Sequence, residues 1–546
     1  MHHALLVDEI LLNILAALRE ADAPYSQLNA VARTCHFLSP LALDFLWSEL
    51  PDVRPLLQYI KPRMPNDPHI SVPSASFQRA AFRVRKLSCP ALAYSDTHSQ
   101  IALTEQLRLL SMMGITTSLF PNLRQLSWTD TDQSRYVYIQ LFLSPTLESL
   151  ELDFFFHKPP DFPFLTLLPK LCPNLRSMSI SKHPVISLSG GEGPSAVRTI
   201  CRLPRLTTLE CKSSTISEED ILHLSQLKSL MTLSLGIPSW VSSDRGSSAP
   251  HNSGAAKDRA DRLWFCNLRN LHLRAFSIPI ITSFLEPGCR SLQSVVFDIS
   301  EAPTTASLTE CFSTLSSSHS ECSAMSSIKV RDSLSNATLG VCQLLPESQV
   351  ITVDVFKPFF TFTKLRVFDL GVCLSFTLDD SDLTAMASSW PELEVFCLNE
   401  GRGWHLSASH PRPSITVRGL RSLCALCPRL YQIAMVLNAL DLFLPCPTTS
   451  PFSRQDTTLV RNLAVTRLSL GDSRLASPQD VASALSSIFP RLKRISAWQY
   501  PLDTLPESRY YRRLWEEVNN ILQQRLKRDI SIRSQIIDIR PLVQHV

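Results

Sequence analysis

One short phrase recurs along most of this chain and constrains the fold more than any other feature. It reads apolar-x-x-apolar-x-apolar, and it returns between residues 80 and 505. The steps between copies include 24 residues, from Leu123 to Leu147, and stretch to 38, from Leu230 to Leu268. The clearest copies begin at Leu123, Leu147, Leu175, Leu206, Leu230, Leu268, Leu292, Leu365, Leu393, Leu430, Val465 and Leu492.

The phrase has a simple physical meaning. Its last two apolar positions alternate, as a strand with one buried face requires, and the first reaches the same core from the preceding turn. Segments between copies often carry helical spacing, as in residues 218–230 and 476–489. One strand and one helix cannot bury their own apolar side, whereas stacked copies can. The pattern therefore predicts an α/β solenoid.

These copies together resemble the leucine-rich repeat. That family usually places Asn or Cys three positions after the last leucine, and only Cys373 and Asn438 satisfy this rule here. Because the polar positions are incomplete and the steps uneven, the resemblance implies an irregular solenoid with long loops over residues 81–505.

The first fifty residues follow a different pattern. Ile10, Ile14 and Leu18 recur at helical spacing, Leu11 and Leu15 widen the stripe, and acidic residues precede them. Two further short helical blocks follow. So much apolar surface in three short helices predicts docking on another surface.

This block resembles the F-box, in order, spacing and residue type, over residues 5–50. The resemblance includes the closing pair Leu46-Trp47, whereas Val7 stands where the family usually has Pro. It implies that residues 1–50 bind a Skp-type linker subunit and, through it, a cullin. The implied partner-binding residues are Leu6, Val7, Ile10, Leu11, Ile14, Leu28, Val31, Cys35 and Trp47. A helical cap on the solenoid is the alternative reading.

Three other segments differ from the repeats. Residues 51–80 are rich in proline and predict a linker. Residues 238–262 are rich in Ser, Gly, Asp and Arg, and predict a disordered insertion. Residues 506–546 hold an amphipathic helix and a tail. Its apolar side predicts an end cap for the array, and its basic cluster leaves a partner-binding helix as the alternative.

Composition limits the class of protein. The formal net charge of +4 on 546 residues argues against a nucleic-acid partner. No apolar stretch reaches membrane-spanning length, and no secretory signal is visible. The 15 cysteines are scattered and predict reduced thiols. We therefore expect a cytoplasmic or nuclear location and no membrane partner.

No motif in the sequence assembles an active site. The pair Cys424 and Cys427 has zinc-like spacing but no second pair or nearby histidines, so buried helix cysteines are the favoured interpretation. We expect no enzyme activity and no metal or other cofactor.

The chain thus reads as α/β, with an N-terminal three-helix F-box, an irregular leucine-rich-repeat solenoid and a C-terminal capping helix. The implied function is a substrate-recognition adaptor of a cullin-RING ubiquitin ligase, whose solenoid binds an unknown target protein. The alternative function is a leucine-rich-repeat scaffold with no ubiquitin-ligase role.

Overall fold

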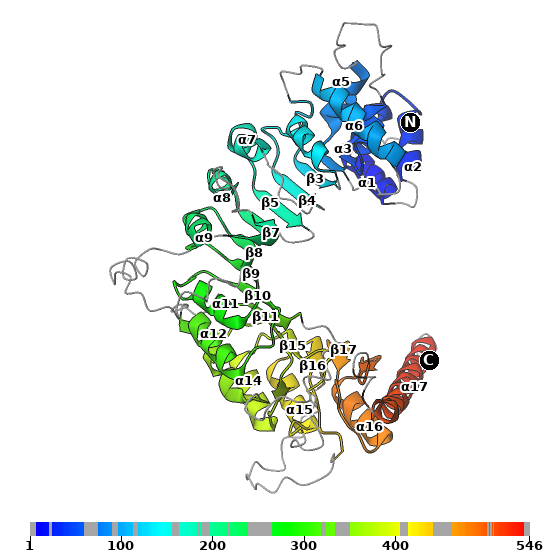
Figure 1. Cartoon of the computed structure of the whole chain (residues 1–546). Helices are drawn as coiled ribbons and strands as arrows, with labels where there is room; N and C mark the ends of the chain where they lie inside the picture. Colours follow the sequence, from blue (N-terminus) through cyan, green and yellow to red (C-terminus); the bar gives the residue numbers. More distant parts are fainter. Residues whose placement is uncertain are drawn as a thin grey trace, which may run out of the picture. The chain divides into compact units, whose positions relative to one another are not determined.

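In the computed structural model, the chain forms two compact units, Met1–Gly236 and Ile237–Val546 (Figure 1). The described residues are 7–20, 24–58, 75–89, 97–112, 118–130, 132–154, 163–182, 186–187, 196–216, 218–237, 265–317, 324–333, 350–404, 413–440, 461–499, 502, 505 and 507–539. The predicted insertion at 238–262 lies outside them.

The first unit begins with three helices, as the sequence predicts. They are α1 (Asp8–Arg19), α2 (Pro24–Ala32) and α3 (Leu38–Ser48). Leu15, Leu28 and Ala42, one residue from each helix, form a shared core and are at most 2% exposed. The three helices therefore form a head with a small core of its own.

The head continues directly into the sheet. Strand β1 (Glu49–Leu50) follows α3 without a break and pairs in parallel with β2 (Lys86–Cys89), Leu50 opposite Leu87. Where the sequence predicts a linker at 51–80, the described parts contain helices α4 (Arg54–Leu57) and α5 (Ala75–Arg83), both with buried residues. The junction is therefore folded at both of its ends.

The strands of the first unit run parallel in the order β1-β2-β3-β4-β5-β7-β8, with β6 beside β7. After β2 these are β3 (Gln125–Asp130), β4 (Ser149–Phe154), β5 (Ser177–Lys182), β6 (Ile186–Ser187), β7 (Thr208–Thr215) and β8 (Thr232–Ile237). The connecting helices are α6 (Thr97–Met112), η2 (Gln133–Phe142), α7 (Pro163–Leu171), α8 (Ala196–Ile200) and α9 (Glu218–Ser225). Helices α7, α8 and α9 lie along one side of the strands (Figure 1).

The second unit repeats this plan. Its parallel strands follow the order β9-β10-β11-β13-β15-β16-β17-β18, and β12 pairs with β14 separately. They are β9 (Asn270–Ala275), β10 (Ser294–Ile299), β11 (Ser327–Asp332), β12 (Val350–Ile351), β13 (Val367–Gly371), β14 (Ser375–Phe376), β15 (Val395–Leu398), β16 (Gln432–Ala434), β17 (Arg467–Ser469) and β18 (Ile495–Ser496). The connecting helices are α11 (Ile278–Leu285), α12 (Thr305–Ser317), η6 (Val353–Val355), η7 (Lys357–Thr361), α14 (Asp380–Ser389), α15 (Val417–Leu426) and α16 (Pro478–Ile488), and α17 (Ser508–Ile539) ends the chain.

The recurring phrase accounts for the core of both units. In the copy that ends in β3, its three positions, Leu123, Leu126 and Trp128, are at most 1% exposed. The aligned register places Leu126 opposite Leu150 of β4, so like positions stack from strand to strand. Each fully buried aliphatic side chain contributes about 1.5–3 kcal/mol. Stacking therefore supplies the burial that a single repeat lacks, and the fold is a solenoid of parallel strands and helices.

A second link joins successive repeats through the backbone. The carbonyl of the residue after the first leucine accepts two N–H groups from the next repeat. The Arg124 carbonyl accepts from Glu148 and Ser149 at 2.8 and 2.9 Å, and the Glu148 carbonyl accepts from Arg176 and Ser177 in turn. The backbone polar groups of the turns that precede the strands are thereby hydrogen-bonded to the neighbouring repeat rather than to water.

The turns that follow the strands are held by polar side chains at positions that differ from repeat to repeat. Asn399 has a positive φ of 57° and is buried, and its side chain accepts from the Val372 N–H at 2.8 Å and donates to the Leu374 carbonyl at 3.0 Å. It follows the last leucine of its phrase by one position, so the family spacing rule missed it. Cys373, which satisfies that rule, is disulfide-bonded.

Helix α17 covers the free edge of β18, the last strand of the second unit. Its buried residues Trp515, Val518 and Leu522 form the apolar side that the sequence assigns to an end cap, and α17 packs on α16. The Asn519 side chain accepts from the Ile495 N–H at 2.8 Å and donates to the Ile495 carbonyl at 3.0 Å. Asn519 thus satisfies both polar groups of Ile495, as a further strand would.

Candidate docking surface

Helix α1 divides its aliphatic residues between two environments. Leu11 and Leu15 are 2% and 1% exposed in the head, whereas Ile10 and Ile14, four residues apart, are 40% and 41% exposed. Side chains at this spacing share one face of a helix. Ile10 and Ile14 therefore form an outward apolar pair on α1.

Val7 extends this pair to the start of the helix. It holds the N-cap position with an extended backbone (φ −91°, ψ 111°) and its side chain is 45% exposed. Its carbonyl accepts from the Ile10 and Leu11 N–H groups, each at 3.1 Å. Asp8 and Glu9 occupy the first turn, where the helix dipole favours negative charge. Helix α1 therefore starts at the predicted place without the family's proline.

The remaining predicted partner-binding residues differ in exposure. Leu28 is buried in the head core, Val31, Cys35 and Trp47 are half-buried, and Leu6 lies outside the described residues. The Leu38 backbone N–H lowers the pKa of Cys35 below its ordinary value. Of the eight predicted residues that the structure describes, Val7, Ile10 and Ile14 are the most exposed, while Leu11 and Leu28 are buried in the head.

Three further apolar residues of the head are exposed. Tyr25, Phe37 and Leu12 are 50%, 45% and 43% exposed. The sequence reasoning named no site role for them because helical spacing alone does not separate inward from outward aliphatic positions in so short a block.

The strand face turned away from the helices is the second candidate surface. In the first unit the outward positions of β3 and β5 are polar and uncharged, whereas those of β4 between them include Glu151 and Asp153. In the second unit charged pairs occupy this face. His272 Nε2 lies 2.7 Å from Asp298 Oδ2, and Arg331 Nη2 lies 2.5 Å from Asp369 Oδ2. The His272 ring lowers the pKa of Asp298.

Strands β15 and β16 depart from the one-sided pattern. Val395, Cys397 and Ala434 occupy outward positions yet are 8%, 1% and 1% exposed, and Val367 packs against them. Gln432 donates to Glu400 Oε2 at 2.9 Å beside them. Both faces of these strands are therefore buried, as in a two-sided parallel sheet.

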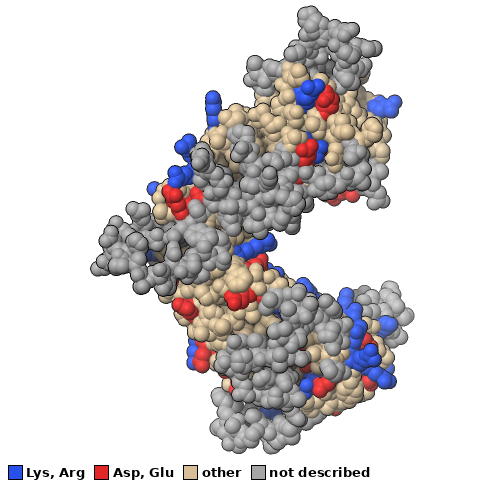
Figure 2. Space-filling view, viewed as in Figure 1, with Lys and Arg blue, Asp and Glu red and all other residues tan. Residues whose placement is uncertain are grey.

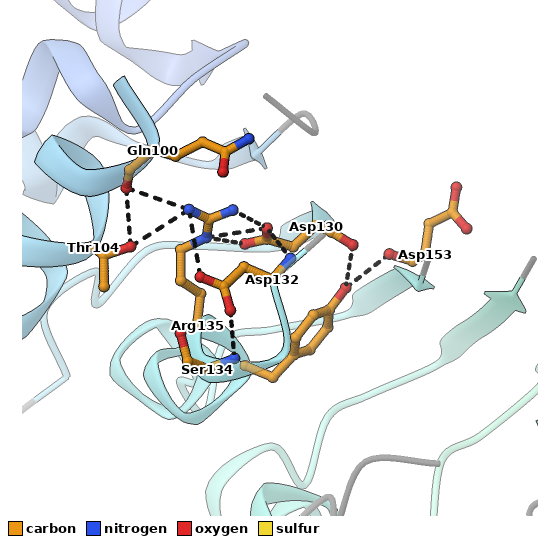
Figure 3. A network of polar contacts seen from close by, with 8 residues as sticks. Gln100, Thr104, Asp130, Asp132, Ser134, Arg135 and Asp153 are labelled. Carbon is orange, nitrogen blue, oxygen red and sulfur yellow. Dashed lines mark hydrogen bonds and ion pairs between the residues drawn. The ribbon is translucent and has the colours of Figure 1, made fainter. Parts of the chain in front are cut away.

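A buried ion pair joins α6, β3 and η2 in the first unit (Figure 3). The Arg135 side chain is 1% exposed and its Nε donates to both Asp130 oxygens, at 3.0 and 2.8 Å. Arg135 Nη1 also donates to the Gln100 carbonyl at 3.3 Å. Burial lowers and the bonded carboxylate of Asp130 raises the pKa of Arg135, with a net rise. The guanidinium is thus held charged as a structural crosslink.

The cysteines match the expectation of reduced thiols at all but one described position. Eleven are free thiols, and Cys373 is the exception because it is disulfide-bonded. Cys424 and Cys427 are buried, and burial raises the pKa of each to about 12. Cys427 Sγ donates to the Trp390 carbonyl at 3.3 Å, which gives this pair a packing role.

The described part of the chain holds neither a metal-binding cluster nor a membrane-spanning helix. No group of three His, Cys, Asp or Glu residues there is placed to hold a metal ion. No helix among the same residues is long and apolar enough to cross a bilayer.

Comparison by sequence and comparison by structure give different results for this chain. No family model matches this chain, and no curated protein matches its sequence. A chain in the crystal structure of the Rad7 and Elc1 complex from yeast is similar over 74% of this chain and 83% of its own length, at 14% identity and a TM-score of 0.36. A likeness of this degree decides neither fold nor function.

Proposed function

We propose that this protein is a non-catalytic substrate receptor of a cullin-RING ubiquitin ligase. In this proposal the head docks on a Skp-type linker subunit, the linker contacts the cullin, and the solenoid binds a target protein. One observation carries the proposal: α1 packs Leu11 and Leu15 inward while it exposes Val7, Ile10 and Ile14. An outward aliphatic row is unfavourable in water and becomes favourable when a partner covers it.

The mechanism that follows is proximity. A target held on the strand face of the solenoid lies near the ubiquitin-charged enzyme on the same assembly, which raises its effective concentration. The receptor then needs no catalytic group of its own. This role places the protein in the cytoplasm or nucleus.

The test is a double substitution on the exposed row. Fully burying one Ile contributes about 1.5–3 kcal/mol, and Ile10 and Ile14 have only 40% and 41% of their surface left to bury. The pair therefore contributes about 1.2–2.4 kcal/mol, and I10D/I14D, which also places two carboxylates against the partner, should lose at least about tenfold in affinity. Co-precipitation of the full-length chain with the Skp-type linker measures this loss. Neither residue belongs to the buried head core, so thermal unfolding of the variant stays near that of the wild type.

The same helix supplies a matched control. Asn13 and Ala17 are also exposed and also four residues apart, so N13D/A17D adds the same charge at the same spacing on α1. We expect this control to retain the linker. Equal retention by I10D/I14D would contradict the proposal and leave the alternative of a repeat scaffold with no ubiquitin-ligase role.

Deletion of residues 1–50 is a poor test by comparison. It removes β1, whose Leu50 pairs with Leu87 of β2 and is only 5% exposed. The truncated solenoid then exposes the edge of β2 whatever the head binds. Surface substitutions separate docking from folding, and the deletion does not.

A further inference from the structure

The first turns of α17 carry an unusual concentration of arginine and tyrosine. The run Arg509-Tyr510-Tyr511-Arg512-Arg513 opens the helix, and Tyr510 is 63% exposed. We name the side chains of Arg509, Tyr510 and Arg513 the arginine–tyrosine surface. Figure 2 shows Lys and Arg residues gathered over this end of the second unit.

The aromatic part of this surface rests on a packed support. Tyr510 makes an edge contact with Tyr511, with ring centroids 5.1 Å apart. Tyr511 stacks on the buried Trp498 at 5.3 Å. The Trp498 indole N–H donates to the Ser473 carbonyl at 2.8 Å. Because its neighbours are fixed, Tyr510 loses little conformational freedom when a partner covers it.

The net positive charge of this C-terminal region exceeds the net positive charge of the whole chain. Residues 461–528 hold twelve Lys and Arg and six Asp and Glu, a net of +6, whereas the entire chain is +4. In the loop before β18, Arg491, Lys493 and Arg494 are exposed, and they precede Ile495, which Asn519 of α17 binds. The loop cations therefore lie beside α17.

Two other arginines at this end of the second unit are paired with glutamates. Arg512 Nε lies 3.4 Å from Glu516 Oε1, and Arg474 Nη2 lies 2.9 Å from Glu507 Oε2. Arg509 and Arg513 make no ion pair with any described residue. Arg509 lies in the first turn of α17, where a cation opposes the helix dipole. Folding therefore gains little from Arg509, and the exposed guanidinium groups of Arg509 and Arg513 point to an external anionic partner.

We propose that the arginine–tyrosine surface docks a short acidic segment of a partner protein. Two free guanidinium groups match carboxylates by charge and by bidentate geometry. Tyr and Arg are also the side chains that carry most energy in protein interfaces. Glu516 and Glu517 on the following turn limit how far a polyanion extends along α17, which favours a short peptide over nucleic acid. This surface is separate from the head, so the proposal holds whether or not the head binds a linker.

The test measures binding of a fluorescein-labelled oligoglutamate peptide to the full-length chain by anisotropy. We expect saturable binding that R509E/R513E weakens by at least about tenfold, and that Y510A also weakens. The matched control is R418E/R421E, which reverses two exposed arginines of α15 in the same unit and should bind as the wild type does.

Stability gives an independent readout. Glutamate at position 509 interacts favourably with the helix dipole, whereas glutamate at position 513 weakly repels Glu517 four residues on. R509E/R513E should therefore melt close to the wild type while it loses the peptide. Absence of peptide binding would overturn the proposal, as would equal loss in both double variants. Tighter binding of a labelled oligouridylate than of oligoglutamate would also overturn it, in favour of nucleic acid.

Discussion

Replacement of Asn519 by leucine tests whether a single side chain closes the edge of the last strand. Asn519 is half-buried, and its amide makes two hydrogen bonds, one with each backbone polar group of Ile495. Leucine has a similar size and makes neither bond. Ile495 then keeps an unpaired N–H and an unpaired carbonyl at the end of the sheet.

The magnitude follows from these two bonds. Each contributes about 0.5–1.5 kcal/mol net, so N519L should lose about 1–3 kcal/mol of local stability. Asparagine-to-leucine also raises helix propensity by a few tenths of a kcal/mol. N520L is the matched control, because Asn520 is the exposed neighbour in the same helix and carries the same propensity gain.

Hydrogen exchange at the Ile495 amide is the direct assay. We expect that amide to exchange faster in N519L than in N520L, with the largest increase at β18. An unpaired strand edge also invites pairing with a second chain, so N519L should show more self-association by light scattering. Unchanged protection of Ile495 in N519L would refute the edge-closing role.

Two further predictions concern buried groups. R135L leaves the Asp130 carboxylate buried without its partner. This change should lower the free energy of unfolding, measured in urea, by about 3–5 kcal/mol. The double variant R135L/D130L should recover much of that loss, and no recovery would contradict the structural role of the ion pair. Near neutral pH, iodoacetamide should label Cys35 before Cys424, because the thiolate is the reactive form and the pKa is lowered at Cys35 and raised to about 12 at Cys424. Labelling of Cys424 should accelerate only as the pH rises towards that value, and equal rates by peptide mass spectrometry at neutral pH would show the burial argument to be wrong.

The repeats illustrate how far sequence reasoning extends. The phrase that begins at Leu123 predicted a strand with one buried face, and β3 buries Leu126 and Trp128 as expected. The copy that begins at Leu292 likewise coincides with a strand, β10. The same reasoning failed at β15, where Val395 is buried on the outward side, because the phrase describes one face of a strand and not what covers the other.

The head shows a second limit. Sequence spacing grouped Ile10 and Leu11 in one broad apolar stripe, and the structure turns the first outward and the second into the core. The difference depends on how α1 packs against α2 and α3, which spacing within α1 does not encode.

Periodicity is a local property, so the sequence by itself determined the solenoid architecture, the strand positions and the helical character of both ends. Tertiary structure decided which apolar residues remain exposed and which polar groups meet. Asn519 and Ile495, or Asp130 and Gln100 around Arg135, are brought together by stacking of elements distant in the chain. The cause is that a side chain's environment is set by its neighbours in space, and most neighbours in a stacked array come from another repeat.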